Sequence, residues 1–280
     1  MATRIIIDST ADINESLNGK FTVVPLSVHF GDEEYIDGVT INHKQFYEKL
    51  IESDVLPTTS QVTPAAFSDV FKEVVESGDD AVVLTISSKL SGTYQSAVIA
   101  AQDFGDKIQV VDSLTVTIGL GVLAEYALKL RDDGMNAKEI AKIITEQREK
   151  VLVIALLDTL EYLQKGGRIS KTVAFAGGLL SIKPVICVKD GVVGMLGKAR
   201  GSKQGNNLLV KEIEAAGGVD FTKPVMLGFT GLSDHLLLKY KEDSSYLWEG
   251  NVENLSYTTI GSVVGTHVGP GAVAVAFFKN

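Results

Sequence analysis

Hydroxyl-bearing side chains are concentrated in two short segments, and each segment directly precedes an expected helix. The first is Thr58-Thr59-Ser60-Gln61, and the second runs from Ser87 to Ser96. Hydroxyl groups and free backbone N–H groups at the positive end of a helix donate hydrogen bonds to a carboxylate or a phosphate. Capping a helix would use only one of these oxygens, so their number favours a site for an anion or a head group. The expected ligand-binding residues in these segments are Thr59, Ser60, Ser91, Gly92 and Thr93.

The second segment combines a strand, a turn that contains Gly92 and a helix, which is the order found in anion-binding loops. Its spacing matches neither the dinucleotide fingerprint nor the P-loop, so no nucleotide cofactor is expected. Cys187 is the single cysteine and cannot build a zinc site by itself, so no bound metal is expected either.

The segment Asp8-Ser9-Thr10-Ala11-Asp12 ends the first expected strand. Ligands of parallel α/β sheets gather at the carboxyl ends of the strands, which is a functional location for acidic and hydroxyl groups. An Asx or Ser/Thr turn would account for the same residue types without a ligand. The sequence leaves both interpretations open.

Two more candidate residues lie in glycine-rich segments. Arg168 belongs to Gly166-Gly167-Arg168-Ile169-Ser170, a turn expected after a short helix, where an arginine is either a surface charge or a clamp for an oxyanion. His267 lies within the glycine-rich segment 265–272. An imidazole in such a place is either a core side chain or a donor to a ligand.

An enzymatic function is the main alternative to ligand binding. A Ser/His acyl hydrolase or acyltransferase would use Ser91 and His267, with Asp8 or Asp112 orienting the imidazole. The segment Gly231-Leu232-Ser233-Asp234-His235 lacks the second glycine of a nucleophile elbow. We therefore expect no catalytic residue and no enzymatic activity of the chain's own.

Composition narrows the possible partners and the compartment. The 280-residue chain carries a formal net charge of −9 and one cysteine. A negative field repels phosphate backbones, so nucleic acid is not an expected partner. No run approaches the roughly 20 apolar residues of a membrane-spanning helix, and no signal-peptide pattern is present at the N-terminus. Because a lone cysteine cannot form an internal disulfide, the sequence indicates a cytoplasmic protein.

The elements that would position these residues are those of an α/β fold. Short apolar runs alternate with segments of helical period, which predicts a mostly parallel sheet flanked by helices. Strands are expected at 4–8, 81–86, 108–112 and 151–157, and a small hairpin near 26–40. Helices are expected to begin at Thr63-Pro64 and at Asn136, where capping residues precede an apolar stripe. The length favours two domains. We expect an N-terminal α/β domain over residues 1–157 and a C-terminal α+β domain over residues 158–280.

Taken together, these motifs resemble the DegV family of fatty-acid-binding proteins, which are the lipid-presenting subunits of bacterial fatty acid kinase. The matching segments occur in order and span nearly the whole chain. They are Asp8-Ser9-Thr10-Ala11-Asp12, Thr59-Ser60-Gln61, Ser87 to Ser96, Leu157-Asp158 with Gly167-Arg168-Ile169, Lys183-Pro184, and residues 265–271.

The resemblance implies two α/β domains and a ligand tunnel between them. It implies that a long-chain fatty acid such as palmitate or stearate is bound, with its carboxylate near Thr59, Ser91 and His267. It also implies that a separate catalytic kinase subunit phosphorylates the bound lipid for phospholipid metabolism, and it associates Arg168 with the acyl-phosphate end and this partner.

Overall fold

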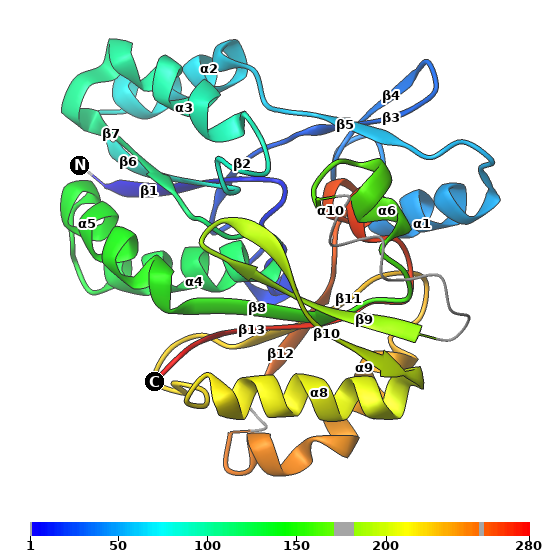
Figure 1. Cartoon of the computed structure of the whole chain (residues 1–280). Helices are drawn as coiled ribbons and strands as arrows, with labels where there is room; N and C mark the ends of the chain where they lie inside the picture. The colour runs from blue at the N-terminus through cyan, green and yellow to red at the C-terminus, as the bar shows by residue number, and fades with distance from the viewer. Residues whose placement is uncertain (1, 171–181, 252–254) are drawn as a thin grey trace.

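Four parallel strands form the first sheet, in the order β2-β1-β6-β7 (Figure 1). The computed structural model describes residues 2–170, 182–251 and 255–280. The strands are β1 (Thr3–Asp8), β2 (Thr22–Val24), β6 (Asp80–Thr85) and β7 (Ile108–Asp112). Side chains alternate between the two faces, so Ile5 and Ile7 enter one core and Ile6 enters the other. Three of these strands were predicted to within one residue at each end.

Helices cover both faces of this sheet, as the alternation of strand and helix segments predicted. On one side lie α2 (Pro64–Glu76) and α3 (Thr93–Ala101), and on the other lie α4 (Ile118–Asp132) and α5 (Ala137–Gln147). Two helix starts follow their predicted caps. Thr63 accepts a hydrogen bond from the Ala66 N–H, and Asn136 forms a capping box with Glu139.

A second, mixed sheet has the strand order β10-β9-β8-β13-β11-β12. Its strands are β8 (Val151–Leu156), β9 (Ile182–Lys189), β10 (Val192–Arg200), β11 (Met226–Phe229), β12 (Ser256–Thr259) and β13 (Val273–Phe278). One face packs on α8 (Gly201–Ala215) and α9 (His235–Asp243), and Cys187 is buried there. The opposite face meets α4.

The helix α4 lies between the two sheets and is buried on nearly all sides (Figure 1). A Cβ atom on Gly121 would lie 2.1 Å from the Asp12 carbonyl oxygen, and one on Gly119 would lie 2.3 Å from Val153 Cγ2. Residues 119–124 match the G-x-G-x-x-A pattern of dinucleotide-binding loops, but they lie inside α4 and not at a turn between a strand and a helix. Their glycines allow close packing of this helix. Through them, α4 lies directly on the loop after β1 and on β8, and elsewhere it also contacts β1 and β6 of the first sheet.

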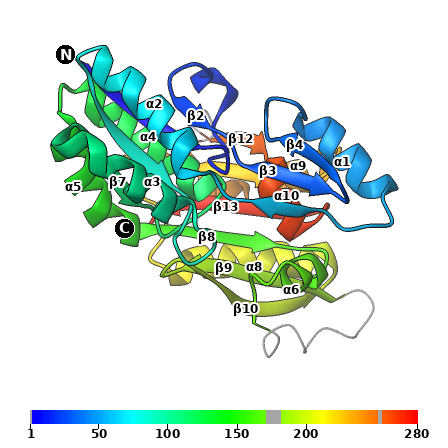
Figure 2. The same ribbon diagram turned by 90° about the horizontal axis from the view of Figure 1, so that it is seen from above.

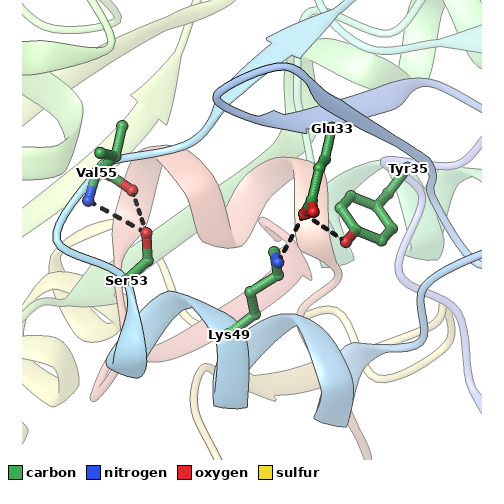
Figure 3. Close-up of polar contacts among 5 residues, drawn as sticks. All are labelled: Glu33, Tyr35, Lys49, Ser53 and Val55. Atoms are coloured by element: carbon green, nitrogen blue, oxygen red, sulfur yellow. Dashed lines mark hydrogen bonds and ion pairs between the residues drawn. The ribbon is translucent and has the colours of Figure 1, made fainter.

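A third, small sheet has the order β4-β3-β5 and includes the hairpin expected near residues 26–40. It consists of β3 (Ser27–Phe30), β4 (Glu33–Ile36) and β5 (Thr58–Ser60). With α1 (His43–Glu52) it lies at the end of the molecule opposite the N-terminus (Figure 2). Figure 3 shows how the hairpin is attached to α1: Lys49 Nζ and Tyr35 Oη each lie 2.8 Å from Glu33 Oε2. The same figure shows Ser53 bonded to the backbone of Val55, where the chain leaves α1 towards β5.

The remaining elements are short. Two short α-helices are α6 (Glu161–Lys165) and α10 (Ser262–Val268), and α10 contacts α1, α6, β3 and β5. The 3₁₀ turns are η1 (Glu15–Leu17), η2 (Gln102–Lys107), η3 (Arg148–Lys150) and η4 (Ser245–Trp248). Among the residues described, none of the helices is long and apolar enough to cross a membrane.

The strand at 151–156 belongs to the second sheet, although we expected it in the first domain. β8 pairs with β9 and β13, so the chain enters the second sheet about six residues before the predicted boundary at 157. The physical reason is that a short apolar run indicates a buried strand without specifying its neighbours. The partners of β8 are β9 and β13, which lie farther along the chain, so only the observed pairing shows to which sheet β8 belongs.

The close packing of α4 gives a stability prediction. Replacing a helical glycine by alanine ordinarily stabilises a protein by about 0.5–1 kcal/mol. Gly121→Ala should instead lower the free energy of unfolding by about 1–3 kcal/mol, because its methyl group would overlap the Asp12 carbonyl. Urea unfolding measures the difference, with Lys138→Ala on the exposed face of α5 as the control, expected within about 0.5 kcal/mol of wild type. A Gly121→Ala protein at least as stable as wild type would contradict the contact.

Candidate functional site

A cavity of about 180 Å³ lies between the loops at the carboxyl end of the first sheet and the face of the second sheet that meets α4. One water molecule needs only about 10–15 Å³ by this kind of measure, so the cavity has room for a larger ligand. Its lining comes from both parts of the chain: Leu26, Thr59, Ser60, Gln61, Ile86, Leu90, Ser91, Gly92, Val116, Thr117, Val153, Ala155, Leu163, Arg168, Ile186, Val188, Val193, Ile260, Val263, Val264, His267, Val268, Ala272 and Ala274.

Most of the wall is aliphatic and comes from alternate positions of neighbouring strands. Val153 and Ala155 of β8 line the cavity beside Ile186 and Val188 of β9, and Ala274 of β13 pairs directly with Ala155. The intervening residues of these strands face α8 and α9. Because side chains alternate along a strand, one sheet serves both as the cavity wall and as part of a separate core.

The polar side chains of the lining include Thr59, Ser91, Arg168 and His267, which come from four different segments. Thr59 is on β5, and His267 is near the end of α10. Thr59 Oγ1 lies 2.9 Å from His267 Nε2. The structure therefore joins two predicted site residues that are 208 positions apart in the sequence.

Glycines allow the segments that carry these residues to approach one another. A Cβ atom on Gly166 would lie 2.2 Å from His267 Nδ1, so the imidazole packs directly on the Gly166 backbone. A Cβ atom on Gly92 would lie 2.0 Å from Gln61 Oε1, and Gln61 Nε2 donates to Ser96 Oγ at 3.0 Å. The two hydroxyl-rich segments are therefore in contact with each other.

Ser60 and Thr93, both predicted to bind ligand, have protein partners. Ser60 Oγ is exposed and lies 2.8 Å from His29 Nε2 on the neighbouring strand. Thr93 is fully buried, and its Oγ1 lies 3.0 Å from Ser91 Oγ. In this arrangement Thr93 orients Ser91, and the Ser60 hydroxyl binds His29 at the edge of the cavity.

Arg168 is half-buried at the cavity, on the turn that follows α6. Its Nε donates to the Leu90 carbonyl at 3.2 Å, and its Nη1 donates to the Gly166 carbonyl at 2.6 Å. Among the residues that the structure describes, no carboxylate lies within ion-pair distance of this guanidinium. Its positive charge is therefore held at the cavity by neutral carbonyls and can attract an anion.

His267 is electrically neutral at physiological pH. Burial, with a smaller contribution from the nearby Arg168 charge, lowers the pKa of His267 to about 4. A neutral imidazole has one donor and one acceptor nitrogen. Nε2 pairs with Thr59, whereas Nδ1 is buried without a hydrogen-bond partner in the described part of the chain.

The hydrogen bonds do not assemble the triad of the hydrolase alternative. Ser91 Oγ pairs with Thr93, and His267 pairs with Thr59. Asp8 accepts bonds from Thr10 and from the Ile86 N–H, and Asp112 accepts bonds from the N–H groups of Ser88 and Leu114. Both carboxylates therefore support the loops that follow β6 and β7. The turn interpretation of the Asp8 segment is the one that its contacts with Thr10 support.

The apolar wall of the cavity was not identified from the sequence. Val153, Ala155, Ile186 and Val188 have the residue types of ordinary buried strands, since a strand that borders a cavity has the same composition as one that borders a core. The small side chains Ala155, Ala272 and Ala274 are the one possible signal. That signal is weak, because alanine is equally common in strands that pack against a helix.

Comparison with known proteins identifies the family. A sequence model of the DegV family matches residues 2–280. The chain belongs to the DegV family. A DegV domain-containing protein of Caldanaerobacter subterraneus is 34% identical over 278 residues, covering 98% of this chain and 97% of the relative.

Solved structures of the DegV family share this fold. A DegV family protein from Thermus thermophilus, described as binding fatty acid, has a TM-score of 0.89 and 32% identity, with both chains fully covered. The Fatty Acid Kinase B3 protein of Streptococcus pneumoniae, loaded with linoleic acid, has a TM-score of 0.86, with both chains fully covered. Its identity is 23%, so that likeness concerns the fold alone.

The low pKa of His267 gives a prediction for its titration. An NMR titration should show the imidazole becoming protonated with a midpoint near pH 4, and His267→Gln would assign the signal. Since the folded pKa lies below the unfolded value of about 6.5, the unfolded chain binds more protons between these pH values. The stabilisation from His267 is therefore complete above about pH 6.5 and decreases as the pH falls towards 4. A midpoint between about pH 6 and 7 would show that the ring is solvated.

Proposed function

We propose that this DegV protein binds a long-chain fatty acid, such as palmitate or stearate, in the cavity between its two sheets. The observation that carries the proposal is the polarity of the lining, which is aliphatic apart from a few polar residues that include Thr59, Ser91, Arg168 and His267. The fatty acid binding of the Thermus thermophilus relative supports the same ligand class.

The energetics of such a ligand fit this lining. Each buried methylene contributes roughly 0.8 kcal/mol, so a chain of a dozen or more carbons binds tightly by its alkyl part alone. The head group then needs only a few hydrogen bonds. Thr59 and Ser91 can donate to the carboxylate, with Gly92 at the same turn and Thr93 and Ser60 supporting the two loops.

We also infer that the protein is a carrier and that a separate kinase subunit phosphorylates the bound carboxylate to an acyl phosphate. The chain has no nucleotide-binding motif, and the hydrogen bonds of Ser91 and His267 are not those of a hydrolase triad. An ATP-dependent partner acts in the cytoplasm, which is the compartment that we propose for this protein. The acyl phosphate would then supply phospholipid metabolism.

Arg168 has its role at the phosphorylation step in this proposal. A phosphoryl group adds negative charge and further acceptor oxygens to the head group, which neutral Thr59 and Ser91 cannot balance. The Arg168 guanidinium, which has no carboxylate partner among the described residues, provides a planar set of donors close to the cavity. His267 can add one more donor if the ring turns its N–H to the ligand.

Removal of either head-group hydroxyl tests the binding site. Thr59→Ala and Ser91→Ala should each weaken the binding of palmitate by about 1.5–3 kcal/mol, because each loses a hydrogen bond to a charged acceptor. Titration calorimetry measures the affinity, after organic extraction and mass spectrometry have identified any lipid that copurifies. Thr145→Ala, which removes a hydroxyl on α5 away from the cavity, is the control. Unchanged affinity in both site variants would contradict the assignment.

Replacement of the arginine separates binding from phosphorylation. Arg168→Ala should bind palmitate with nearly wild-type affinity but fail to support phosphorylation in an assay with the kinase subunit and ATP. Arg168→Lys, which keeps the charge without the planar fork, should be intermediate. If Arg168→Ala supports phosphorylation at the wild-type rate, the arginine has no part in the transfer.

A further inference from the structure

A buried carboxyl group connects three distant parts of the chain behind the cavity. Asp12 is 4% exposed and lies in the loop after β1. Its Oδ1 accepts a hydrogen bond of 2.8 Å from the N–H of Gly261, and its Oδ2 accepts one of 2.5 Å from Thr117 Oγ1. A local turn would use neighbouring residues, whereas these partners are 249 and 105 positions away.

The peptide group between Ile260 and Gly261 is held at both of its polar atoms. Asp12 binds its N–H, and the hydroxyl of the buried Tyr47 donates to its carbonyl at 2.9 Å. Gly261 is the N-cap residue of α10. A single peptide plane at the start of α10 is therefore clamped by two side chains from the N-terminal half of the chain.

The hydrogen bonds of Asp12 and Tyr47 to the Ile260–Gly261 peptide group affect the binding site, because α10 carries His267 near its other end. Gly265 allows this helix to lie directly on α1, since a Cβ atom there would be 2.6 Å from Tyr47 Oη. Gly261 and His267 are six residues apart, which is about 9 Å along a helix axis. A small tilt at Gly261 would therefore displace the imidazole relative to Thr59, with which it shares a 2.9 Å contact.

We propose that Asp12 is a positioning residue of the ligand site, which together with Tyr47 fixes α10 so that His267 meets Thr59 at the polar part of the cavity. The inference rests on the proposed function in that a fatty acid head group would use this arrangement. Asp12 itself does not line the cavity.

The strained backbone of Thr117 is a second observation that agrees with this role. Thr117 has a φ of 55°, which is rare for a β-branched residue, and it also lines the cavity. Strained residues persist where the surroundings hold them and are concentrated at functional sites. Burial also raises the pKa of Asp12 to about 8, so keeping a carboxyl group here is costly. Its hydrogen bonds to Gly261 and Thr117 lower this pKa but do not cancel the effect of burial.

The test compares a fatty acid with a neutral lipid of the same length. Palmitate and 1-hexadecanol share the alkyl contacts and differ in the head group that His267 and Thr59 would receive. Asp12→Ala should weaken palmitate binding about tenfold or more while hexadecanol affinity changes less than about twofold. Asp12→Asn should retain most of the preference, because its amide oxygen can still accept from Gly261. In the double variant with His267→Ala, the loss of Asp12 should add little to the loss of His267.

A second variant and an NMR measurement test the positioning role even if Asp12→Ala does not fold. If Asp12→Ala does not fold, Tyr47→Phe removes only the hydroxyl at Ile260 and should shift the palmitate preference in the same direction. In the ligand-free proteins, NMR signals of the His267 ring should move in Asp12→Ala and Tyr47→Phe but not in Asp80→Asn, a buried aspartate at the opposite end of the first sheet.

The positioning role is overturned if Asp12→Ala weakens both lipids equally, if its effect adds fully to that of His267→Ala, or if the His267 ring signals do not move. A wild-type protein that binds neither lipid would instead overturn the proposed function. The ring signals of the ligand-free proteins would still decide whether Asp12 positions His267.

Discussion

The close contact of α4 with both sheets is the constraint on which the rest of the structure depends. Gly121 lets the helix touch the Asp12 carbonyl after β1, and Gly119 lets it touch Val153 on β8. Interiors are packed as densely as organic crystals, so a helix held this closely sets the separation of the two sheets. The cavity lies beyond the N-terminal end of α4, where this helix no longer occupies the space between the two sheets. Val116 and Thr117, which directly precede α4, form part of the cavity wall.

The cavity has an aliphatic wall and a polar part because different segments of the chain line the two. Strands of the second sheet contribute aliphatic side chains on one face, whereas loops that follow β5 and β6 contribute hydroxyl groups. Polar groups in such a place ordinarily find partners, because an unpaired buried polar atom costs about 1–3 kcal/mol. Thr59 and Ser91 have protein partners that a ligand could replace, and His267 Nδ1 has none among the described residues. This contrast between the aliphatic wall and the polar groups distinguishes the cavity from an ordinary core and is what the proposed lipid site requires.

Local signals were reliable where short-range chemistry decides the structure. The caps at Thr63 and Asn136, the hairpin within 26–40 and three strands of the first sheet follow from residue types a few positions apart. The membership of β8 could not be predicted, because its partners β9 and β13 lie farther along the chain. Among the site residues, Thr59 and His267 were each identified by their own motifs, but their contact was implied only by the resemblance to the family.

The sequence alone therefore determined the alternating α/β elements, the hydroxyl-rich loops, the two candidate residues Arg168 and His267, and the resemblance to the DegV family. Tertiary structure alone decided which faces of the strands enclose a cavity and that Ser60 binds His29 while Thr59 meets His267. It also decided that Asp12 binds the start of α10. The reason is that propensities and caps depend on neighbours within a few residues, whereas an enclosed space depends on pairings between strands and helices that are far apart in the sequence.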